Sequence, residues 1–182
     1  YYAFKYDGGL FGIPSVDMPD FDELIGIDYQ KQTLIDNTKA FVNGKKANNV
    51  LLFGDRGTGK SSSVKALLKM FAKDGLRLIE LPKQNIKDIP CLAKTLSEKP
   101  HKYILFLDDL SFEAEEPEYK SLKIAMEGQL QAQNDNMLVY ATSNRRHLVK
   151  ETLSDRQGDD MHRNDQMQET LSLSERFGIS LV

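Results

Sequence analysis

The stretch Gly54-Asp55-Arg56-Gly57-Thr58-Gly59-Lys60-Ser61 decides the fold, because it matches the pattern G-x-x-x-x-G-K-[ST] at every fixed position. The apolar run at residues 50–53 comes directly before it and has the length of a buried parallel strand. Residues 60–72 follow it, with apolar side chains at the i, i+3, i+4 and i+7 spacing of a helix. The sequence therefore predicts a strand, a glycine-rich phosphate loop and a helix in that order.

Each residue type in this loop suits a polyphosphate. Glycines let the backbone curl and point several N–H groups inward, because they have no Cβ to clash with the phosphates. The helix that follows adds about half a positive charge at its N-terminus. Lys60 supplies a full charge for the β and γ phosphates, and the Ser61 hydroxyl can ligate Mg²⁺. We expect residues 54–62, through Ser62, to bind a nucleoside triphosphate; a plain glycine-rich turn is the alternative.

Predicted strands and helices alternate outward from the loop. Apolar runs predict further strands at 77–81, 103–107, 137–141 and 179–182. Helical spacing or start signals predict helices at 28–42, 86–96, 117–132 and 165–177. This alternation indicates an α/β fold, with a parallel sheet between two layers of helices. Residues 1–26 carry glycine and proline too often for a long helix or strand, so we expect an extended segment laid over a core at 27–182.

Two acids end the most apolar predicted strand. Asp108 and Asp109 directly follow residues 103–107. Asp108 is expected to hold Mg²⁺, through a water, because Mg²⁺ gives up its waters reluctantly. Asp109 is expected to orient and polarise the attacking water. Glu113 is a second candidate for that base, because it is longer than an aspartate, and a plain cap on the Ser111 turn is the other interpretation of Asp109.

The length and composition limit the classes of protein that fit this sequence. The chain has 182 residues, the length of one domain, and its first residue is not Met, so we expect a piece of a longer protein. Its 24 Lys and Arg against 27 Asp and Glu give a net charge of −3, which disfavours a globally basic nucleic-acid binder. The single cysteine, Cys91, fits a reducing compartment. No apolar run approaches the roughly 20 residues that span a bilayer, so we expect a cytoplasmic protein without membrane contact. Nucleic acid is a possible partner, but no feature of the sequence supports it.

Four blocks in this order resemble the AAA+ ATPases. They are the phosphate loop, the acidic strand end at 104–109, Val139-Tyr140-Ala141-Thr142-Ser143-Asn144, which is similar to the sensor 1 strand, and Leu173-Ser174-Glu175-Arg176-Phe177, which is similar to the arginine-finger segment. Leu24-Ile25-Gly26-Ile27 resembles the segment that packs beside the adenine. More narrowly, the chain resembles a bacterial AAA+ family of ATP-binding proteins whose function is unassigned.

The resemblance implies a specific fold and site. It implies a P-loop NTPase core, a three-layer α/β/α sandwich whose five parallel strands follow the order 5-1-4-3-2. It implies ATP and Mg²⁺ as ligands, Ile25 and Gly26 beside the base, and Asn144 near the γ-phosphate or the attacking water. It also implies a homo-oligomer in which Arg176 acts in trans on a neighbour's site. The family's helical lid would begin where the chain ends, so we expect the lid to lie outside it.

Plainer interpretations of these polar residues stay open. Asn144 is also typical of a turn at a strand end. Arg176 also suits a surface salt bridge with Glu175 or Glu169. Asn48-Asn49 precedes the first strand of the core, where some AAA+ proteins restrain the catalytic acid, and a simple turn explains this pair as well.

An acidic stretch lies near the end of the chain. Residues 151–182 contain seven acids against three arginines. The acids and the one histidine in question are Asp155, Asp159, Asp160, His162 and Asp165. We expect an exposed arm that packs against the next protomer, with a metal site as the alternative.

Three functions fit the sequence. The first is an oligomeric AAA+ ATPase that couples ATP hydrolysis to remodelling of an unknown macromolecule. Most of the family ends the acidic strand in Asp-Glu, and Asp-Asp here predicts slow hydrolysis. The second is a nucleotide-gated binding module with little turnover. The third is a P-loop kinase of a small molecule, for which the sequence offers no clear acceptor pocket or arginine-bearing lid.

Overall fold

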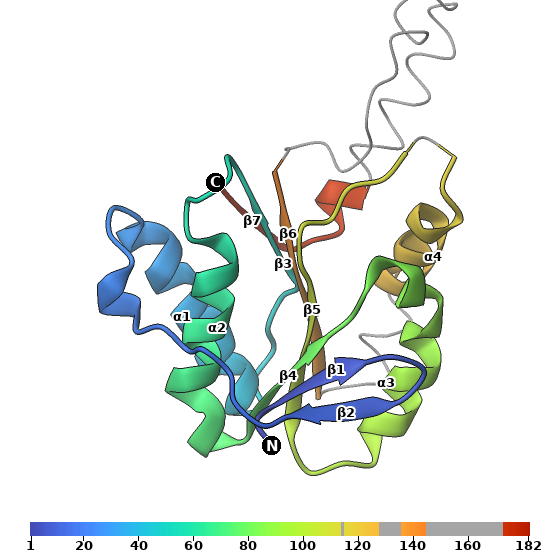
Figure 1. Ribbon diagram of the computed structural model, residues 1–182, viewed down its shortest axis with the longest axis horizontal. Coiled ribbons are helices and arrows are strands. Elements are labelled where there is room, and N and C mark those ends of the chain that lie inside the picture. The colour runs from blue at the N-terminus through green and yellow to red at the C-terminus, as the bar shows by residue number, and fades with distance from the viewer. Residues whose placement is uncertain (114, 128–135, 145–172) are drawn as a thin grey trace, which may run out of the picture.

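The fold is built around one mixed β-sheet. The computed structural model describes residues 1–113, 115–127, 136–144 and 173–182. In these residues the sheet has seven strands, in the spatial order β2-β1-β4-β5-β6-β3-β7 (Figure 1). Their bounds are β1 Ala3–Tyr6, β2 Leu10–Ile13, β3 Val50–Phe53, β4 Leu76–Glu80, β5 Lys102–Leu107, β6 Met137–Ser143 and β7 Ile179–Leu181.

The predicted count of five strands in a parallel sheet is wrong. The five strands that the sequence predicted occupy consecutive positions, β7-β3-β6-β5-β4, and each neighbouring pair is parallel. Two more strands come from residues 1–26: β1 pairs in parallel with β4 and antiparallel with β2. The signal for this hairpin was the Asp7-Gly8 dipeptide, because Gly8 adopts the positive φ of 67° that a tight turn needs. Residues 3–13 therefore extend the sheet, whereas Val16, Met18 and Phe21 pack against the core, as expected for this segment.

Helices cover both faces of the sheet (Figure 1). On one face lie α1 (Asp28–Val42) and α2 (Lys60–Phe71), and on the other lie α3 (Ile89–Ser97) and α4 (Pro117–Met126). Short 3-10 turns are η1 (Phe21–Glu23), η2 (Ala72–Asp74) and η3 (Lys83–Asp88), and residues 173–175 are also helical. The predicted α/β/α layering is thus confirmed. No helix in the described ranges has both the length and the apolar character to cross a bilayer.

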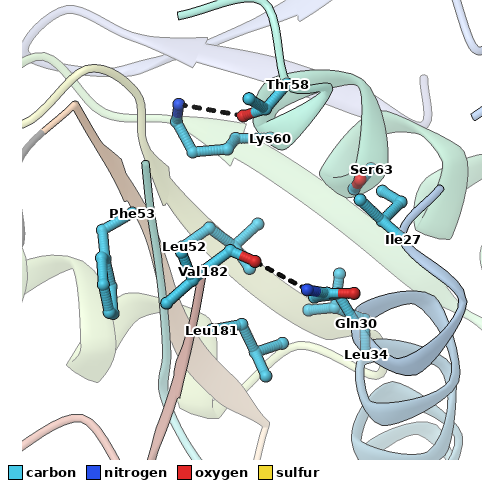
Figure 2. Close-up of a pocket in the computed structure, with 10 residues that line it drawn as sticks. All are labelled: Ile27, Gln30, Leu34, Leu52, Phe53, Thr58, Lys60, Ser63, Leu181 and Val182. Carbon is cyan, nitrogen blue, oxygen red and sulfur yellow. Dashed lines mark hydrogen bonds between the residues drawn. The ribbon is translucent and has the colours of Figure 1, made fainter. Parts of the chain in front are cut away.

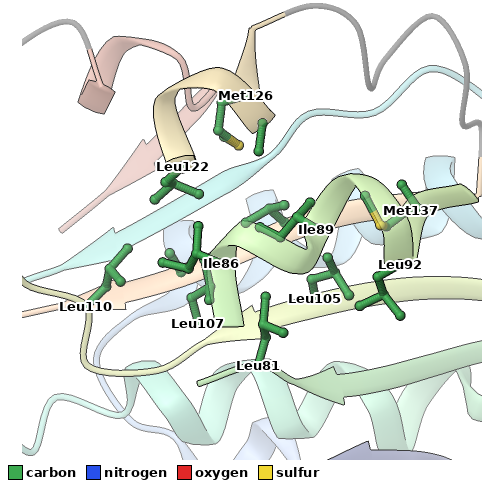
Figure 3. Packing of buried hydrophobic residues seen from close by; sticks show 14 of the residues in the cluster. Leu81, Ile86, Ile89, Leu92, Leu105, Leu107, Leu110, Leu122, Met126 and Met137 are labelled. Atoms are coloured by element: carbon green, nitrogen blue, oxygen red, sulfur yellow. The ribbon is translucent and has the colours of Figure 1, made fainter. Parts of the chain in front are cut away.

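Alternate residues of β5 enter two separate cores. Leu105 and Leu107 pack with residues of α3, η3 and α4 (Figure 3). Ile104 and Phe106 belong to the other core, which includes the apolar faces of α1 and α2. Side chains of a strand alternate between the two faces of a sheet, so a strand covered on both sides must be apolar at successive positions. This double burial explains the continuous apolar run that ends at Asp108.

A buried polar cluster ties α1 to β6. The Asn37 side-chain amide donates to Tyr140 Oη at 2.9 Å and to the Asn48 carbonyl at 2.9 Å. The backbone N–H of Asn48 donates back to Asn37 Oδ1 at 2.9 Å. Thr38 Oγ1 lies 2.8 Å from Tyr140 Oη, and burial of the phenol raises the pKa of Tyr140 to about 12. These bonds fix β6, the strand that directly precedes Asn144, against α1.

We predict that Tyr140→Phe lowers the free energy of unfolding by about 1–3 kcal/mol, because it leaves the buried Asn37 amide without this acceptor and the buried Thr38 hydroxyl without its partner. The pKa of Tyr140 is raised on folding, so its contribution is complete below the ordinary value near 10 and is lost as pH rises through about 12. Urea unfolding at pH 8 and pH 11 should show a smaller alkaline loss in the variant. Tyr29→Phe, at a side chain that is 75% exposed, is the control; equal stability of the two variants at pH 8 would contradict the prediction.

Candidate functional site

The phosphate loop follows β3 and starts α2. Gly57 and Gly59 have φ angles of 77° and 85°, in the left-handed region that favours glycine. Gly59 is the N-cap residue of α2, so the loop opens onto the positive end of that helix. The N–H of Gly54 donates to the Ser143 carbonyl at 3.1 Å, which places the start of the loop beside the end of β6.

The Lys60 ammonium lies over this loop. Its Nζ donates to the carbonyl groups of Gly54 at 2.8 Å and Asp55 at 2.6 Å. It also lies 3.4 Å from Thr58 Oγ1 (Figure 2). Thr58 Oγ1 also donates to the Asp55 carbonyl at 2.9 Å. The ammonium is therefore held by neutral oxygens and has no carboxylate partner among these contacts. Phosphate oxygens can replace those carbonyl groups and gain the full charge of the lysine.

The first turn of α2 meets the end of β5. Ser61 Oγ donates to Asp108 Oδ1 at 2.6 Å, across 47 residues of sequence. A hydroxyl and a carboxylate are oxygen ligands of the kind that Mg²⁺ prefers, with phosphates and waters completing its shell. No cluster of three or more His, Cys, Asp or Glu side chains suited to a metal occurs in the part of the chain that the structure describes. Ser61 and Asp108 fit Mg²⁺ that arrives with a nucleotide.

Asp109 has a strained backbone beside Asn144. Its φ of 53° is the only positive value of a non-glycine residue in the described ranges, and this conformation costs about 1–2 kcal/mol. Asn144 Nδ2 donates to Asp109 Oδ1 at 2.9 Å, and the Asp109 N–H donates to Thr142 Oγ1 at 2.8 Å. The structure thus brings together both predicted residues, Asp109 and Asn144. Glu113, the other candidate base, is exposed, and its N–H donates to the Glu116 carboxylate at 3.2 Å.

A pocket lies between the phosphate loop, α1 and the end of β7 (Figure 2). Its lining combines apolar side chains with the polar loop; it comprises Ile27, Gln30, Leu34, Leu52, Phe53, Thr58, Lys60, Ser63, Leu181 and Val182. Gln30 Nε2 donates to the Val182 carbonyl at 2.7 Å across its rim. An apolar pocket with a few polar groups suits a planar base.

The predicted base contacts Ile25 and Gly26 do not line this cavity. Ile25 is 93% exposed, whereas Ile27, directly before α1, faces the cavity. Sequence reasoning also missed Gln30. The available signal was the helical spacing of residues 27, 30 and 34, which places them on one face of α1.

Arg176 has no described hydrogen bond or ion pair to the phosphate loop of its own chain. Its Nη2 is 2.9 Å from Glu127 Oε1 at the end of α4, so its partner is neither Glu175 nor, among the described residues, any other acid. The buried neighbours Leu173 and Phe177 fix this segment in the core. Arg176 Nε is buried without a hydrogen-bond partner in the described ranges.

The structure places some of the other predicted residues outside the phosphate site, and others lie outside the described residues. Asn49 is buried, and its Oδ1 accepts from the Val139 N–H at 2.8 Å, while Asn48 bonds to Asn37. Asn49 therefore bonds to β6 and Asn48 to α1, and neither has a hydrogen bond to Asp109 among the described contacts. Glu169 and the acidic stretch Asp155, Asp159, Asp160, His162 and Asp165 lie outside the described residues.

Comparison with known proteins identifies the fold. A family model described as "Protein of unknown function (DUF815)" matches residues 1–182. A search of curated proteins gives no match. Among solved structures, the chain is similar to a single-residue variant of Thermotoga maritima RuvB, with a TM-score of 0.53 and 18% identity over 89% of this chain and 46% of that one.

Two further solved structures give the same result. The ORC1 protein of Aeropyrum pernix, in complex with DNA, has a TM-score of 0.57 and 17% identity over 85% of this chain and 44% of that one. C. elegans PCH-2 has a TM-score of 0.55 and 18% identity over 86% of this chain and 43% of that one. All three are AAA+ ATPases, and the chain spans less than half the length of each. At these identities the likeness shows the AAA+ fold, as the sequence predicted.

The backbone of Asp109 leads to a stability prediction. We expect Asp109→Gly to be more stable than Asp109→Ala by about 1 kcal/mol, because both lose the carboxylate but only glycine adopts a φ of 53° without strain. Chemical denaturation of the two variants measures the difference. The matched pair is Asp108→Gly and Asp108→Ala, at a residue with ordinary φ, where alanine should be the more stable of the two. Finding alanine favoured at both positions would contradict the prediction.

Proposed function

The chain belongs to the family described as "Protein of unknown function (DUF815)", and we propose that it is an AAA+ ATPase that binds ATP with Mg²⁺ and hydrolyses it to remodel a macromolecular partner. The observation that carries this proposal is the 2.6 Å hydrogen bond from Ser61 Oγ to Asp108 Oδ1. It joins the end of the phosphate loop to the acidic end of β5, which is the pairing that a nucleotide-bound Mg²⁺ requires.

The nucleotide would lie along the phosphate loop with its base in the neighbouring cavity. The cavity adjoins the loop, because Thr58 and Lys60 line both. Residues 54–62 supply backbone N–H groups and the start of α2, and Lys60 supplies the mobile charge for the terminal phosphates. Ser61 and Asp108 would hold Mg²⁺, whose charge neutralises the phosphate oxygens during transfer.

Asp109 is the proposed base for the attacking water. Its Oδ1 accepts from Asn144 Nδ2 at 2.9 Å, so Oδ2 can accept from a water while Asn144 keeps the carboxylate oriented. The Asn144 amide can also donate to a phosphate oxygen if it leaves Asp109. An aspartate is shorter than the glutamate that most of the family uses, and we therefore propose slow turnover.

A homo-oligomer would complete the site. Arg176 has no described hydrogen bond or ion pair to residues 54–62 of its own chain and pairs with Glu127 instead. We propose that it acts on the nucleotide of a neighbouring copy, as an arginine finger, and stabilises charge in the transition state. The remodelled partner is a macromolecule of unspecified class.

A nucleotide-gated module with little turnover is the second candidate. The aspartate at position 109 favours it, because its side chain is shorter than the glutamate that most of the family uses there. Tight ATP binding without phosphate release at any protein concentration would distinguish the module from the ATPase.

Lys60→Ala tests nucleotide binding. We predict that it weakens ATP binding by at least about 100-fold, because it removes charge-assisted hydrogen bonds to the phosphates. Isothermal titration calorimetry measures the change. Lys69→Ala is the matched control, since Lys69 lies on the same helix and pairs with Asp20 at 2.8 Å on the surface. Equal affinity in both variants would remove the phosphate loop from the site.

Asp109→Asn tests the chemistry. Asparagine tolerates positive φ, so we predict that the variant folds and binds ATP as the wild type does, while phosphate release falls by about 100-fold or more. A coupled phosphate-release assay over a range of protein concentrations measures turnover. Glu113→Gln is the companion variant. Unchanged turnover in Asp109→Asn, with loss in Glu113→Gln, would assign the base to Glu113.

A further inference from the structure

The hydroxyl of Thr142 lies between the two acids at the end of β5. Thr142 is 2% exposed and belongs to β6, which pairs in parallel with β5. Its Oγ1 donates to Asp108 Oδ1 at 2.7 Å and accepts from the Asp109 N–H at 2.8 Å. Its carbonyl accepts from the Leu110 N–H at 2.7 Å. One buried residue thus holds three successive residues of the acidic turn.

The orientation of Thr142 follows from strand alternation. Leu138 and Tyr140 belong to the core on the α1 and α2 side of the sheet, and Thr142 continues their alternation along β6. Ile104 and Phe106 belong to the same core, and Asp108 continues their alternation along β5. Both side chains therefore project to the face where α2 begins, which is why Ser61 also contacts Asp108.

The Asp108 carboxylate is oriented from two sides. Oδ1 accepts from Ser61 at 2.6 Å and from Thr142 at 2.7 Å. Over the described residues, no hydrogen bond to Oδ2 is found. Two donors on one oxygen fix the plane of the carboxylate. A Ser61 hydroxyl that ligated Mg²⁺ through an oxygen lone pair would keep its hydrogen for Asp108, and Thr142 would supply the second donor from a buried position that is independent of the metal.

The same hydroxyl supports the strained turn at Asp109. A residue with φ of 53° persists when its surroundings over-determine it. The N–H of Asp109 is held by Thr142 and its carboxylate by Asn144. The Thr142 hydroxyl donates its single hydrogen to Asp108 and accepts the Asp109 N–H with an oxygen lone pair, so it can make both hydrogen bonds at once.

We propose that Thr142 is a positioning residue that sets the metal-binding carboxylate of Asp108 and the water-orienting carboxylate of Asp109 together; this inference rests on the proposed ATPase function. The hydroxyl itself need not touch the nucleotide. Its loss should raise the Mg²⁺ requirement through Asp108 and lower turnover through Asp109. A role in strand packing alone would change stability and neither of these quantities.

The test compares Thr142→Val with Thr142→Ser in the ATPase assay. Valine keeps the shape and removes the hydroxyl, whereas serine restores it. Thr38→Val is the matched control, because Thr38 is also fully buried and its hydroxyl bonds only to Tyr140 among the described contacts. For each variant, the Mg²⁺ concentration at half-maximal activity, kcat and the affinity for ATP without Mg²⁺ are measured, together with the thermal unfolding midpoint.

Thr142→Val should raise the half-saturating Mg²⁺ and lower kcat, each by about tenfold or more, because hydrogen bonds to charged groups have effects of that size. Its affinity for metal-free ATP should stay within about threefold of wild type, and Thr142→Ser should restore both kinetic quantities. Thr38→Val should unfold at a lower temperature with an unchanged Mg²⁺ requirement. Kinetics of Thr142→Val that match those of Thr38→Val would overturn the inference.

Two further outcomes are distinguished. If Thr142→Val does not fold, Thr142→Cys replaces it; the weakly donating thiol should give an intermediate Mg²⁺ requirement, and a wild-type value would overturn the inference. If the wild type neither binds ATP nor releases phosphate, the proposed function fails and this inference fails with it. A wild type that hydrolyses ATP with a Mg²⁺ requirement insensitive to Thr142 would overturn the inference alone.

Discussion

The parallel pairing of β5, β6 and β3 is the constraint on which the candidate site depends. Parallel strands end at a common edge of the sheet, and here Leu107 pairs with Ala141 while Phe53 pairs with Ser143. The residues that follow each strand therefore meet at one edge, and α2 begins there. The short hydrogen bond between Ser61 and Asp108 follows from this geometry, although the two residues are far apart in sequence.

The charged side chains at this edge of the sheet bond to neutral partners. The described contacts of Asp108 and Asp109 come from the neutral donors Ser61, Thr142 and Asn144, whereas Lys60 bonds to backbone carbonyl groups. A direct pair between Lys60 and Asp108 would satisfy both charges and would have to break before a metal could bind. With neutral partners, the carboxylates keep their attraction for a divalent ion and the ammonium keeps its attraction for phosphate.

The sequence predicted those parts of the fold that local pattern determines. The phosphate loop, the strands beside it and the helices on both faces follow from apolar spacing and from glycine positions. The hairpin β1–β2 was missed because its strands are short and broken by glycine, with the turn signal at Asp7-Gly8 as the clue. Thr142 and Gln30 were missed for another reason: their roles depend on which residue lies opposite them in space, and single-sequence patterns do not give those pairings.

The pairing of Arg176 with Glu127 bears on how an assembly could use this arginine. Both side chains are partly exposed, at 31% and 47%, and such surface ion pairs contribute about 0–1 kcal/mol. In the proposed assembly, exchange of Glu127 for a phosphate would therefore cost little, whereas a water-excluded contact with a polyphosphate would be much stronger. The buried neighbours Leu173 and Phe177 hold the backbone of the segment in place, so only the arginine side chain has to change partners. A fixed backbone with a weakly held side chain is compatible with a finger that acts on a neighbouring copy.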